Sequence, residues 1–326
     1  MKHIYITGGA GYVGSSLVPY LLEEGYKVSV IDLFLYGDDV LDTHPNLNLI
    51  KGDIRDTVLL ENTIKNVDTV IHLACISNDP SFELNPTLGR SINLDAFEPL
   101  VRISKNSGVR RFVYASSSSV YGVKTEKNVH EGMSLDPLTD YSIFKAECED
   151  ILLSMTTSYF ETVVIRPATI CGYARRVRLD VVVNLLTNIA YNNRVITIFG
   201  GDQLRPNLHI KDMVRAYHAV IEATASIVNG EIFNVGYHNL SVSEIANLVK
   251  SNVGDDVILE TQPTNDNRSY HIDSTKFNKA LNFLPEETVD SAIKQLVENF
   301  KAGNMQDSLT ATKYSNIKRM QEVHLE

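Results

Sequence analysis

The stretch ITGGAGYVGSS, Ile6–Ser16, constrains the fold of this chain more than any other part of the sequence. It follows a short apolar run, HIYIT (3–7), and opens a segment with helical spacing. Gly8 permits a tight turn, Gly11 lets a diphosphate approach the backbone, and Gly14 lets the helix pack closely on the strand. The pattern predicts a strand–loop–helix unit whose helix N-terminus binds the diphosphate of a dinucleotide.

Acidic residues follow the next two predicted strands. Asp32 ends the strand 28–32, where a carboxylate binds both hydroxyls of an adenosine ribose and repels a 2′-phosphate. The chain is therefore expected to prefer NAD to NADP. Asp53 closes the third predicted strand, 47–53, and two roles are open for it. It either reaches the adenine amino group or serves as the N-cap of the next helix.

Short strands rich in Val and Ile alternate with helical segments along the first half of the chain. The predicted strands are 3–7, 28–32, 47–53, 68–74, 110–117 and 162–167. Such alternation is typical of a parallel sheet covered by helices on both faces. We therefore predict an α/β fold, a doubly wound parallel sheet of the Rossmann type with a smaller α/β C-terminal substrate lobe.

The alternation loosens after Pro167, where Arg, Asn and Gly become more frequent. This change predicts a boundary between two domains. The NAD-binding domain is expected to span 1–170, with 208–238 returning to it. The substrate-binding lobe is expected to comprise 171–207 and 239–326.

Composition excludes several classes of function. The chain has 326 residues and a formal net charge of −10 at pH 7, which argues against binding to nucleic acid or to an anionic membrane. It contains no run of about 18 apolar residues that could span a membrane. No signal-peptide pattern precedes the first strand, and the three cysteines form neither a disulfide framework nor a metal motif. A cytoplasmic protein without a metal site is expected.

Tyr141 and Lys145, in YSIFK, lie four residues apart in a predicted helix, so their side chains share one helix face. Free tyrosine has a pKa of about 10 and is a poor base at neutral pH. A nearby ammonium stabilises the phenolate, and Tyr141 can then accept a proton from a substrate hydroxyl while hydride leaves the same carbon. The spacing alone is weak evidence, since surface pairs of this kind are common. It gains weight from YASSSSVYG (114–122), whose strand ends at the cofactor-binding edge of the predicted sheet.

A series of motifs occurs in an order that is typical of one family: TGGAGYVG, Asp32, GDIRD, HLA (72–74), YASSSSVYG, YSIFK and RPATICG (166–172). Together they resemble the extended short-chain dehydrogenase/reductase family, and within it the NAD-dependent nucleotide-sugar epimerases and dehydratases. The resemblance covers most of the chain. It implies NAD as the cofactor and a nucleoside-diphosphate sugar as the substrate.

The resemblance also implies roles for single residues. Ser117, three residues before the Val of VYG, hydrogen-bonds the reacting hydroxyl, Tyr141 is the base, and Lys145 binds the nicotinamide ribose. Asn93 braces the backbone and positions water, and Pro167 packs beside the nicotinamide carboxamide. The residues predicted to contact NAD lie in the glycine loop, at strand ends and on the YSIFK helix: Gly8, Gly11, Tyr12, Val13, Gly14, Asp32, Asp53, Ile54, Leu73, Ala74, Tyr141, Lys145 and Pro167.

Substrate-binding residues are predicted mainly in the second half of the chain. Arg205 and Arg268 match family arginines, and two guanidinium groups can clamp a diphosphate in bidentate fashion. Ordinary surface arginines are the alternative. Arg178 belongs to a basic cluster with Arg175 and Arg176, for which a solvated loop is an equally good interpretation. The set predicted to contact the substrate is Asn78, Ser118, Ser119, Thr169, Arg178, Asn184, Arg205 and Arg268.

The sequence favours epimerisation over dehydration. In the family's 4,6-dehydratases an Asp–Glu pair follows the reacting Ser or Thr, whereas this chain has Ser118 and Ser119 there. Neutral hydroxyls cannot easily remove the C5 proton or protonate a leaving hydroxyl. We therefore predict an NAD-dependent nucleotide-sugar 4-epimerase that acts through a transient 4-keto sugar by hydride transfer. The alternatives are a nucleotide-sugar 4-oxidoreductase, a 4,6-dehydratase and, from another class, a catalytically silent NAD-sensing binding protein.

Two departures from the family pattern concern the sugar. Thr169 stands where the family usually has Asn, and RRVRLDVVVN (175–184) resembles a subgroup that acts on unusual sugars. Thr169 weakens one expected contact with the sugar nucleotide, and the second departure argues against simple UDP-galactose epimerisation. The family usually dimerises through its fourth and fifth helices, here about 95–107 and 141–157, so a homodimer is implied by resemblance. The C-terminal segment 305–326 matches none of these motifs and is expected to be an extra helix or a loosely held tail.

Overall fold

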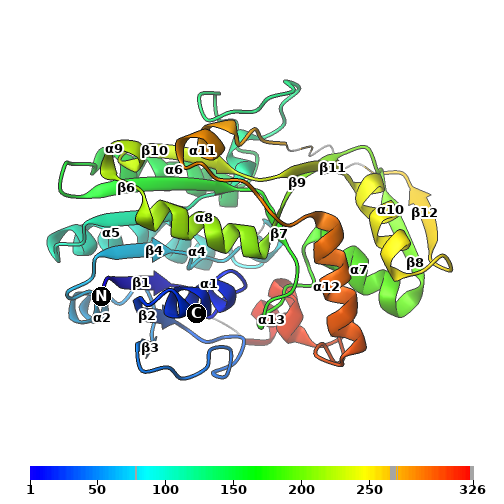
Figure 1. Ribbon diagram of the computed structural model, residues 1–326, viewed down its shortest axis with the longest axis horizontal. Coiled ribbons are helices and arrows are strands. Elements are labelled where there is room, and N and C mark those ends of the chain that lie inside the picture. Colours follow the sequence, from blue (N-terminus) through cyan, green and yellow to red (C-terminus); the bar gives the residue numbers. More distant parts are fainter. Residues whose placement is uncertain (78, 265–268, 270, 324–326) are drawn as a thin grey trace.

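A computed structural model of the chain describes residues 1–77, 79–264, 269 and 271–323. Its main element is a parallel sheet of seven strands in the order β10-β6-β5-β4-β1-β2-β3 (Figure 1). These strands are β1 His3–Thr7, β2 Lys27–Asp32, β3 Leu47–Lys51, β4 Thr69–His72, β5 Arg111–Ala115, β6 Glu161–Pro167 and β10 Glu231–Val235. All six strands predicted from the sequence are present, and the predicted fold class is confirmed.

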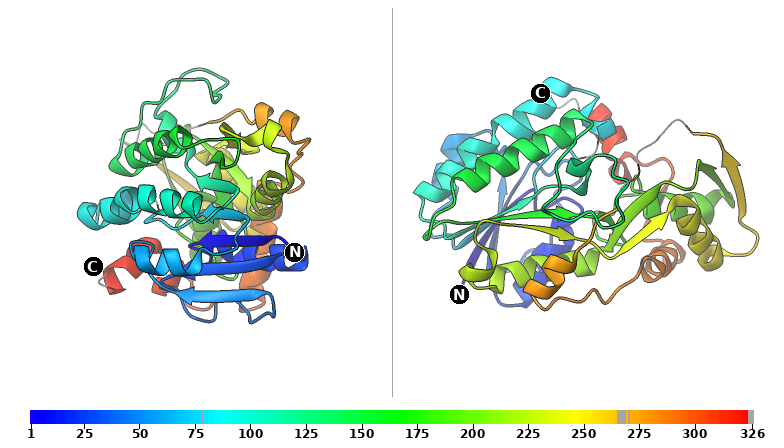
Figure 2. Two further views of the ribbon diagram at one scale, coloured as in Figure 1. Left: turned by 90° about the vertical axis from the view of Figure 1, so that its left-hand side faces the viewer. Right: turned by 90° about the horizontal axis from the view of Figure 1, so that it is seen from above.

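Successive residues of the strands serve opposite faces of the sheet, and both faces are buried. Ile4 and Ile6 of β1 belong to one hydrophobic core, and Tyr5 between them belongs to the other. Helices cover the two faces, as Figure 2 shows. They are α1 Gly14–Glu23 and α8 Ile210–Glu222 on the Ile4 face, and α2 Thr57–Thr63, α5 Phe97–Asn106 and α6 Asp140–Ser154 on the Tyr5 face. The Val- and Ile-rich strands are thus explained by burial on both sides.

A smaller lobe lies beyond the carboxyl ends of the strands, on the right in Figure 1. Its own core joins three helices to a two-stranded sheet, and a three-stranded sheet connects it to the large sheet. Its elements are β7 Thr169–Cys171, α7 Val182–Asn193, β8 Val195–Phe199, β9 Leu204–His209, β11 His238–Ser241, α10 Val242–Val253, β12 Ile258–Gln262 and α12 Val289–Lys301.

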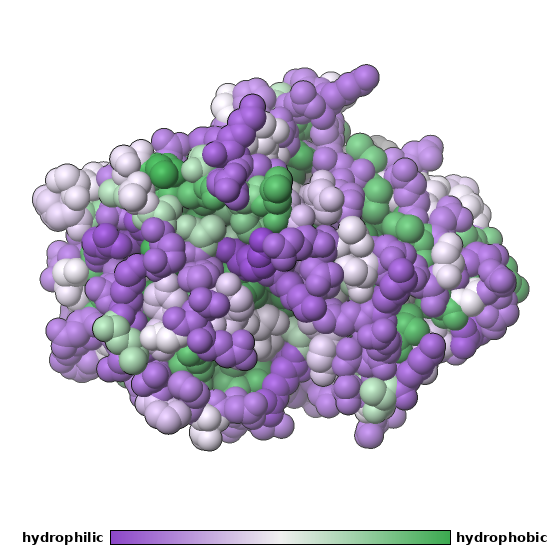
Figure 3. Space-filling view, in the orientation of Figure 1, coloured by the Kyte–Doolittle hydropathy of each residue, from purple (hydrophilic) through white to green (hydrophobic). Residues whose placement is uncertain are grey.

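Short helices complete the described chain. They are α3 Asp79–Phe82, α4 Pro86–Arg90, the π-helix η1 Ser91–Asp95, the 3₁₀ helix η2 Ser118–Tyr121, α9 Ala225–Val228, α11 Thr275–Ala280, the 3₁₀ helix η3 Thr312–Tyr314 and α13 Asn316–Val323. The face of the molecule in Figure 3 is mostly hydrophilic, with apolar residues in separate patches. No helix in the described ranges is long and apolar enough to cross a membrane.

A buried ion pair ties two central strands to α8. Arg111 of β5 is fully buried, and its Nε donates to the Glu161 carboxylate of β6 at 2.7 Å. Its other nitrogens donate to the carbonyl oxygens of Ile221 at 2.9 Å and Ala223 at 2.8 Å, where α8 ends. The guanidinium thus satisfies orphan carbonyls at a helix C-terminus, where a positive charge is favourable.

Removing the acidic partner of this pair should destabilise the protein strongly. Glu161→Ala leaves a buried guanidinium without its counter-charge, and we expect the free energy of unfolding to fall by about 3–5 kcal/mol in urea titrations. Lys294→Ala is the control, since it removes an exposed helical ion pair with Asp290 and should cost no more than about 0.5 kcal/mol. Equal losses for the two variants would contradict this account of the ion pair.

Candidate active site

The glycine loop leaves no room for side chains at two of its three predicted glycines. Gly8 has a φ of +72°, and a Cβ there would lie 2.6 Å from the backbone nitrogen of Ala74. A Cβ on Gly14 would overlap the backbone of Gly9, so α1 could not pack against the loop. Gly11 faces open space apart from the Gly8 oxygen, and it lines a cleft. The loop therefore forms a cradle that a diphosphate can approach closely at the α1 N-terminus.

Asp32 both supports this loop and lines the cleft. One carboxylate oxygen accepts from the Ala10 N–H at 2.9 Å and the other from the Phe34 N–H at 2.8 Å. Burial raises the pKa of Asp32, and these two hydrogen bonds oppose that shift. The carboxylate is thus fixed at the end of β2, where the ribose of a dinucleotide is expected.

Asp53 also lines the cleft, and its carboxylate forms an ion pair with Arg55 at 2.7 Å. The N-cap alternative for Asp53 is wrong, because Asp56 caps α2 by accepting from the Leu59 N–H at 2.9 Å. Asp53 therefore lines the cleft as a carboxylate paired with Arg55, and its contact with adenine stays a prediction.

The start of α6 positions the predicted base. A capping box between Thr139 and Ser142 fixes the helix N-terminus, and Tyr141 lies in the first turn. Lys145, one turn later, is buried, and its Nζ donates to the Ala115 carbonyl oxygen at 2.6 Å. The same Nζ lies 5.7 Å from the centroid of the Tyr141 ring. The ammonium is therefore held between the end of β5 and the tyrosine whose phenolate it would stabilise.

The serine run after β5 forms a tight turn at the same edge. Ser117 is the N-cap of η2, and its Oγ accepts from the Ser119 N–H at 3.1 Å. The two hydroxyl oxygens of Ser117 and Ser119 lie 2.8 Å apart. This turn presents Ser117, Ser118 and Ser119 to the cleft.

A buried polar network supports this edge from behind. Glu149 of α6 accepts from the Ser116 hydroxyl and pairs with Arg166 of β6 at 2.5 Å. Arg166 also donates to the Tyr121 hydroxyl at 2.8 Å, which donates to Asn234 of β10 at 2.8 Å. The network links α6, the serine turn and two strands, so it restricts movement of Ser117 relative to Tyr141. Glu149 is not among the residues predicted from the sequence, because no local pattern distinguishes a buried carboxylate from an exposed one.

Asn93 braces the segment that follows β4. Its side-chain amide donates to the Ile76 carbonyl oxygen at 2.9 Å and accepts from the Ile76 N–H at 2.8 Å. Such a paired contact replaces a backbone ladder where the strand has ended. It agrees with the backbone role expected for this residue.

One cleft of about 570 Å³ brings most of the predicted residues together. It lies at the carboxyl edge of the sheet, where doubly wound folds bind their ligands. The predicted residues that line it are Gly8, Gly11, Tyr12, Val13, Gly14, Asp32, Asp53, Ile54, Leu73, Ala74, Ser117, Ser118, Ser119, Tyr141, Lys145, Pro167, Thr169, Arg178 and Arg205. Asn78 and Arg268 lie outside the described residues.

Asn184 is a correction to the predicted substrate set. It is fully buried and does not line the cleft. Its amide donates to the Tyr12 hydroxyl at 3.1 Å and to the Arg178 carbonyl oxygen at 2.8 Å, and it accepts from the Gly172 N–H at 3.0 Å. With its polar atoms used in this way, Asn184 connects the glycine loop to the smaller lobe and is not placed to contact a ligand in the cleft.

Two further polar side chains near the cleft, His72 and Arg178, form hydrogen bonds or ion pairs with other residues of the protein. Burial lowers the pKa of His72 to about 3, so this side chain is neutral, and its Nδ1 lies 2.7 Å from the Thr7 hydroxyl. Arg178 pairs with Asp180 at 2.9 Å and donates to the Ser77 hydroxyl at 3.2 Å. In the described part of the chain no cluster of His, Cys, Asp and Glu could hold a metal ion.

The position of the cleft over the glycine loop places the chain among the Rossmann-type dinucleotide-binding enzymes. Comparison with known proteins identifies the family. Residues 4–236 match the model of the NAD dependent epimerase/dehydratase family, and the chain therefore belongs to that family. Its cofactor is NAD, and the glycine cradle and the Asp32 carboxylate fit this group.

Curated relatives and solved structures resemble the chain over most of its length. The UDP-glucose 4-epimerase of Lactobacillus helveticus is 26% identical over 312 residues, which cover 89% of this chain and 94% of the relative. The dTDP-D-glucose 4,6-dehydratase of Dictyostelium discoideum is 30% identical over 76% of this chain and 60% of its own length. The UDP-glucose 4-epimerase of Thermotoga maritima, solved with UDP-glucose, superposes with a TM-score of 0.84 at 26% identity, covering 92% of this chain and 99% of that structure.

The charge of Asp32 should set the preference between the two dinucleotides. In Asp32→Asn the side-chain oxygen can still accept a loop hydrogen bond, but the negative charge that disfavours a 2′-phosphate is lost. We expect NAD affinity to fall about tenfold and NADP affinity to rise, measured by calorimetry with both dinucleotides. An unchanged ratio of the two affinities would refute the ribose assignment. Asp38→Asn, at an exposed ion pair on the following loop, is the control.

Proposed function

We propose that the protein is an NAD-dependent nucleotide-sugar 4-epimerase. The proposal rests on the residues that line the cleft. Ser117, Tyr141 and Lys145 line it together, and each of its described carboxylates already has a hydrogen-bond or ion-pair partner within the protein. A dehydratase would need an acid and a base beside the sugar in addition to the oxidising set. An epimerase needs only NAD, the three residues Ser117, Tyr141 and Lys145, and enough room for the keto sugar to rotate.

The carboxylates of the described cleft are Asp32, Asp53 and Asp180. Asp32 accepts two hydrogen bonds from the glycine loop and the β2 loop, and Asp53 pairs with Arg55. Asp180 pairs with Arg178, which lowers the pKa of Asp180 and keeps it ionised. None of the three is placed to shuttle protons at C5 and C6, which supports epimerisation over dehydration.

Three residues of the chain have separate proposed roles in the reaction at the C4 carbon of the sugar. NAD, when bound, accepts hydride from this carbon and returns it. Tyr141 would take the proton of the C4 hydroxyl and later give it back, and Ser117 would hydrogen-bond the same oxygen. Lys145, held by the Ala115 carbonyl oxygen, keeps a positive charge near the Tyr141 ring and so favours its phenolate.

We assign the nucleoside-diphosphate sugar to the side of the cleft formed by the smaller lobe. Thr169 and Arg205 line the cleft there, beside the serine turn. Arg205 carries a positive charge that suits a diphosphate, and Arg268 is proposed as its second arginine by resemblance alone. We propose the same division of domains that the sequence predicts: a cofactor domain, 1–170 with 208–238, and a substrate lobe, 171–207 with 239–326. Arg205 belongs to the substrate lobe, and Thr169 lies at the boundary between the two.

Product analysis separates the proposed reaction from its rivals. The full chain is incubated with a panel of UDP- and dTDP-sugars, and the products are analysed by mass spectrometry and NMR. An epimerase gives a product of unchanged mass with inverted C4. Loss of one water would identify a 4,6-dehydratase, loss of two hydrogens a one-way 4-oxidoreductase, and bound NAD without any turnover a binding protein.

Removal of one hydroxyl group tests the proposed base. Tyr141→Phe keeps the ring beside Lys145 but cannot accept a proton, so we expect turnover to fall about 10²–10⁴-fold with NAD content unchanged. The control is Tyr159→Phe, at a ring that is 72% exposed and does not line the cleft, which should retain full activity. Full turnover by Tyr141→Phe would overturn the mechanism.

We further propose a cytoplasmic homodimer. Its interface is assigned to α5 and α6, the helices through which the family resemblance implies dimerisation. The three cysteines, Cys75, Cys148 and Cys171, are free thiols, which agrees with a reducing compartment.

A further inference from the structure

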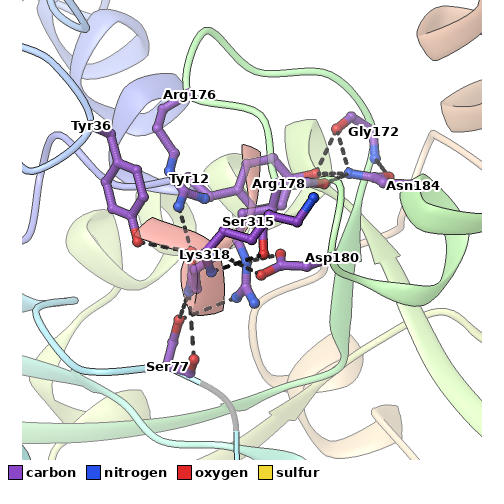
Figure 4. A network of polar contacts seen from close by, with 11 residues as sticks. Tyr12, Tyr36, Ser77, Gly172, Arg176, Arg178, Asp180, Asn184, Ser315 and Lys318 are labelled. Atoms are coloured by element: carbon purple, nitrogen blue, oxygen red, sulfur yellow. Dashed lines mark hydrogen bonds and ion pairs between the residues drawn. The ribbon is translucent and has the colours of Figure 1, made fainter. Parts of the chain in front are cut away.

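The C-terminal segment is docked on the cleft through one buried side chain. Asn316, the first residue of α13, accepts from the Tyr36 hydroxyl at 3.0 Å and from Arg176. Figure 4 shows Tyr36, Ser77, Arg176 and Asp180 around this point, next to Ser315. Its amide nitrogen donates to the Ser77 hydroxyl at 2.6 Å, and its backbone N–H donates to Asp180 at 2.7 Å. The described part of the segment that matches no motif, which ends at Val323, is therefore packed beside the cleft. It joins the loops after β2 and β4 to the smaller lobe.

Two further residues of α13 extend this contact. Met320 lines the cleft beside Asn316, and Arg319 donates from Nε to the Leu35 carbonyl oxygen at 2.5 Å. Leu35 also lines the cleft. The helix thus spans from the loop after β2 to the loop after β4 across the dinucleotide side of the cleft.

Arg176 is the unusual member of this group. It is 4% exposed, its guanidinium carbon lies 3.6 Å from the centroid of the Tyr36 ring, and it lines the cleft. Its Nε has no hydrogen-bond acceptor, and within the described ranges no carboxylate lies at ion-pair distance from it. Burial lowers the pKa of Arg176, and neighbouring Tyr36 and Asp180 oppose this shift only in part. A buried guanidinium of this kind is costly unless an anion completes the site.

The three arginines of the basic cluster lie in three different environments. Arg175 has an exposed side chain that pairs with exposed Asp42. Arg178 is partly buried and pairs with Asp180. Arg176 alone of the three lacks a carboxylate partner among the described residues. Within this cluster and the described ranges, the lack of a carboxylate at ion-pair distance is thus specific to Arg176.

The position of Arg176 indicates which anion could bind beside it. Its backbone N–H donates to the Ser15 hydroxyl at 3.3 Å, in the first turn of α1. Its side chain lies on Tyr36, four residues beyond the ribose-binding Asp32. These contacts place Arg176 at the helix N-terminus that the glycine cradle prepares for a diphosphate. The substrate side of the cleft, with Thr169 and the serine turn, lies at the other strand ends.

We propose that Arg176 binds the diphosphate of NAD, and that Asn316 positions Arg176 for this contact, which makes the C-terminal segment part of the cofactor site. Arg176 supplies the charge-assisted donor that the backbone N–H groups of the loop lack. α13 then closes the cofactor side of the cleft and slows NAD dissociation. Slow release of NAD suits an epimerase, because epimerisation returns NAD to its oxidised form at the end of each catalytic cycle.

Competition binding on the full chain tests the charge contact. Labelled NAD is displaced by adenosine or by ADP-ribose, which carries the diphosphate, from the wild type, Arg176→Met and the matched control Arg175→Met. We expect Arg176→Met to weaken ADP-ribose about ten- to a hundredfold and to leave adenosine unchanged. Arg175→Met should change neither affinity. UDP is measured in parallel with NAD saturating, and its affinity should be unchanged.

Three results would overturn the proposal. Equal losses for adenosine and ADP-ribose would show a structural role, an unchanged ADP-ribose affinity would show no contact, and a selective loss of UDP affinity would assign Arg176 to the substrate diphosphate. Because these readouts need no turnover, they are independent of the proposed epimerase activity.

A second pair of variants keeps the charge and tests the positioning. Asn316→Ala frees Arg176 and the docked helix, and it should increase the rate of NAD release about tenfold in exchange with labelled NAD. Gln321→Ala, at an exposed position of the same helix, should leave the rate unchanged. A rate for Asn316→Ala equal to that of the wild type would refute the role of α13, even if Arg176→Met proved too unstable to purify.

Discussion

The close approach of the glycine loop to its neighbours is the constraint on which the rest of the site depends. Gly14 packs against Gly9 without a side chain between them, and Gly8 turns the backbone against Ala74. These contacts bring α1 onto β1 so that its N-terminus opens into the cleft. Asp32 then ties the loop to the end of β2 through the Ala10 N–H. A larger side chain at either glycine would move the helix and the cradle together.

The reacting edge of the cleft is held by buried charge, since the strands have ended there and no backbone ladder remains. Lys145 is anchored on the Ala115 carbonyl oxygen, and Glu149 of the same helix joins Ser116 to Arg166. Both contacts bind α6 to β5 and β6. Buried polar networks that are fully satisfied restrict the conformations of a site, and this one sets the distance between the serine turn and Tyr141.

The smaller lobe and the C-terminal segment complete the cleft from the other side. Tyr12 of the glycine loop donates to the Gly172 carbonyl oxygen at 2.5 Å, and Asn184 joins both to the segment that carries Arg178. The same segment carries Arg176, which Asn316 holds on the Tyr36 ring. The cofactor side is thus built from three parts of the chain that are distant in sequence.

Much of this architecture could be predicted from the sequence. The alternation of strands and helices, the spacing of Gly8, Gly11 and Gly14 and the order of the motifs predicted the fold class, the family and NAD, and all three are confirmed. Such features are local, because strand burial and helix periodicity repeat within a few residues. The alternative role of Asp53 as an N-cap was wrong, because a local pattern cannot choose between two nearby aspartates. Asp56 fits the N-cap pattern equally well, and it is Asp56 that caps α2.

What the sequence alone determined is therefore the parallel sheet, the dinucleotide loop and the Tyr141–Lys145 pair on one helix face. Only the tertiary structure decided that Asn184 is a buried brace, that Arg176 has no carboxylate at ion-pair distance among the described residues, and that α13 lines the cleft. Those contacts join residues such as Tyr36 and Asn316, which are 280 positions apart. No local pattern encodes them, because burial and pairing of a polar group depend on which distant segment packs against it.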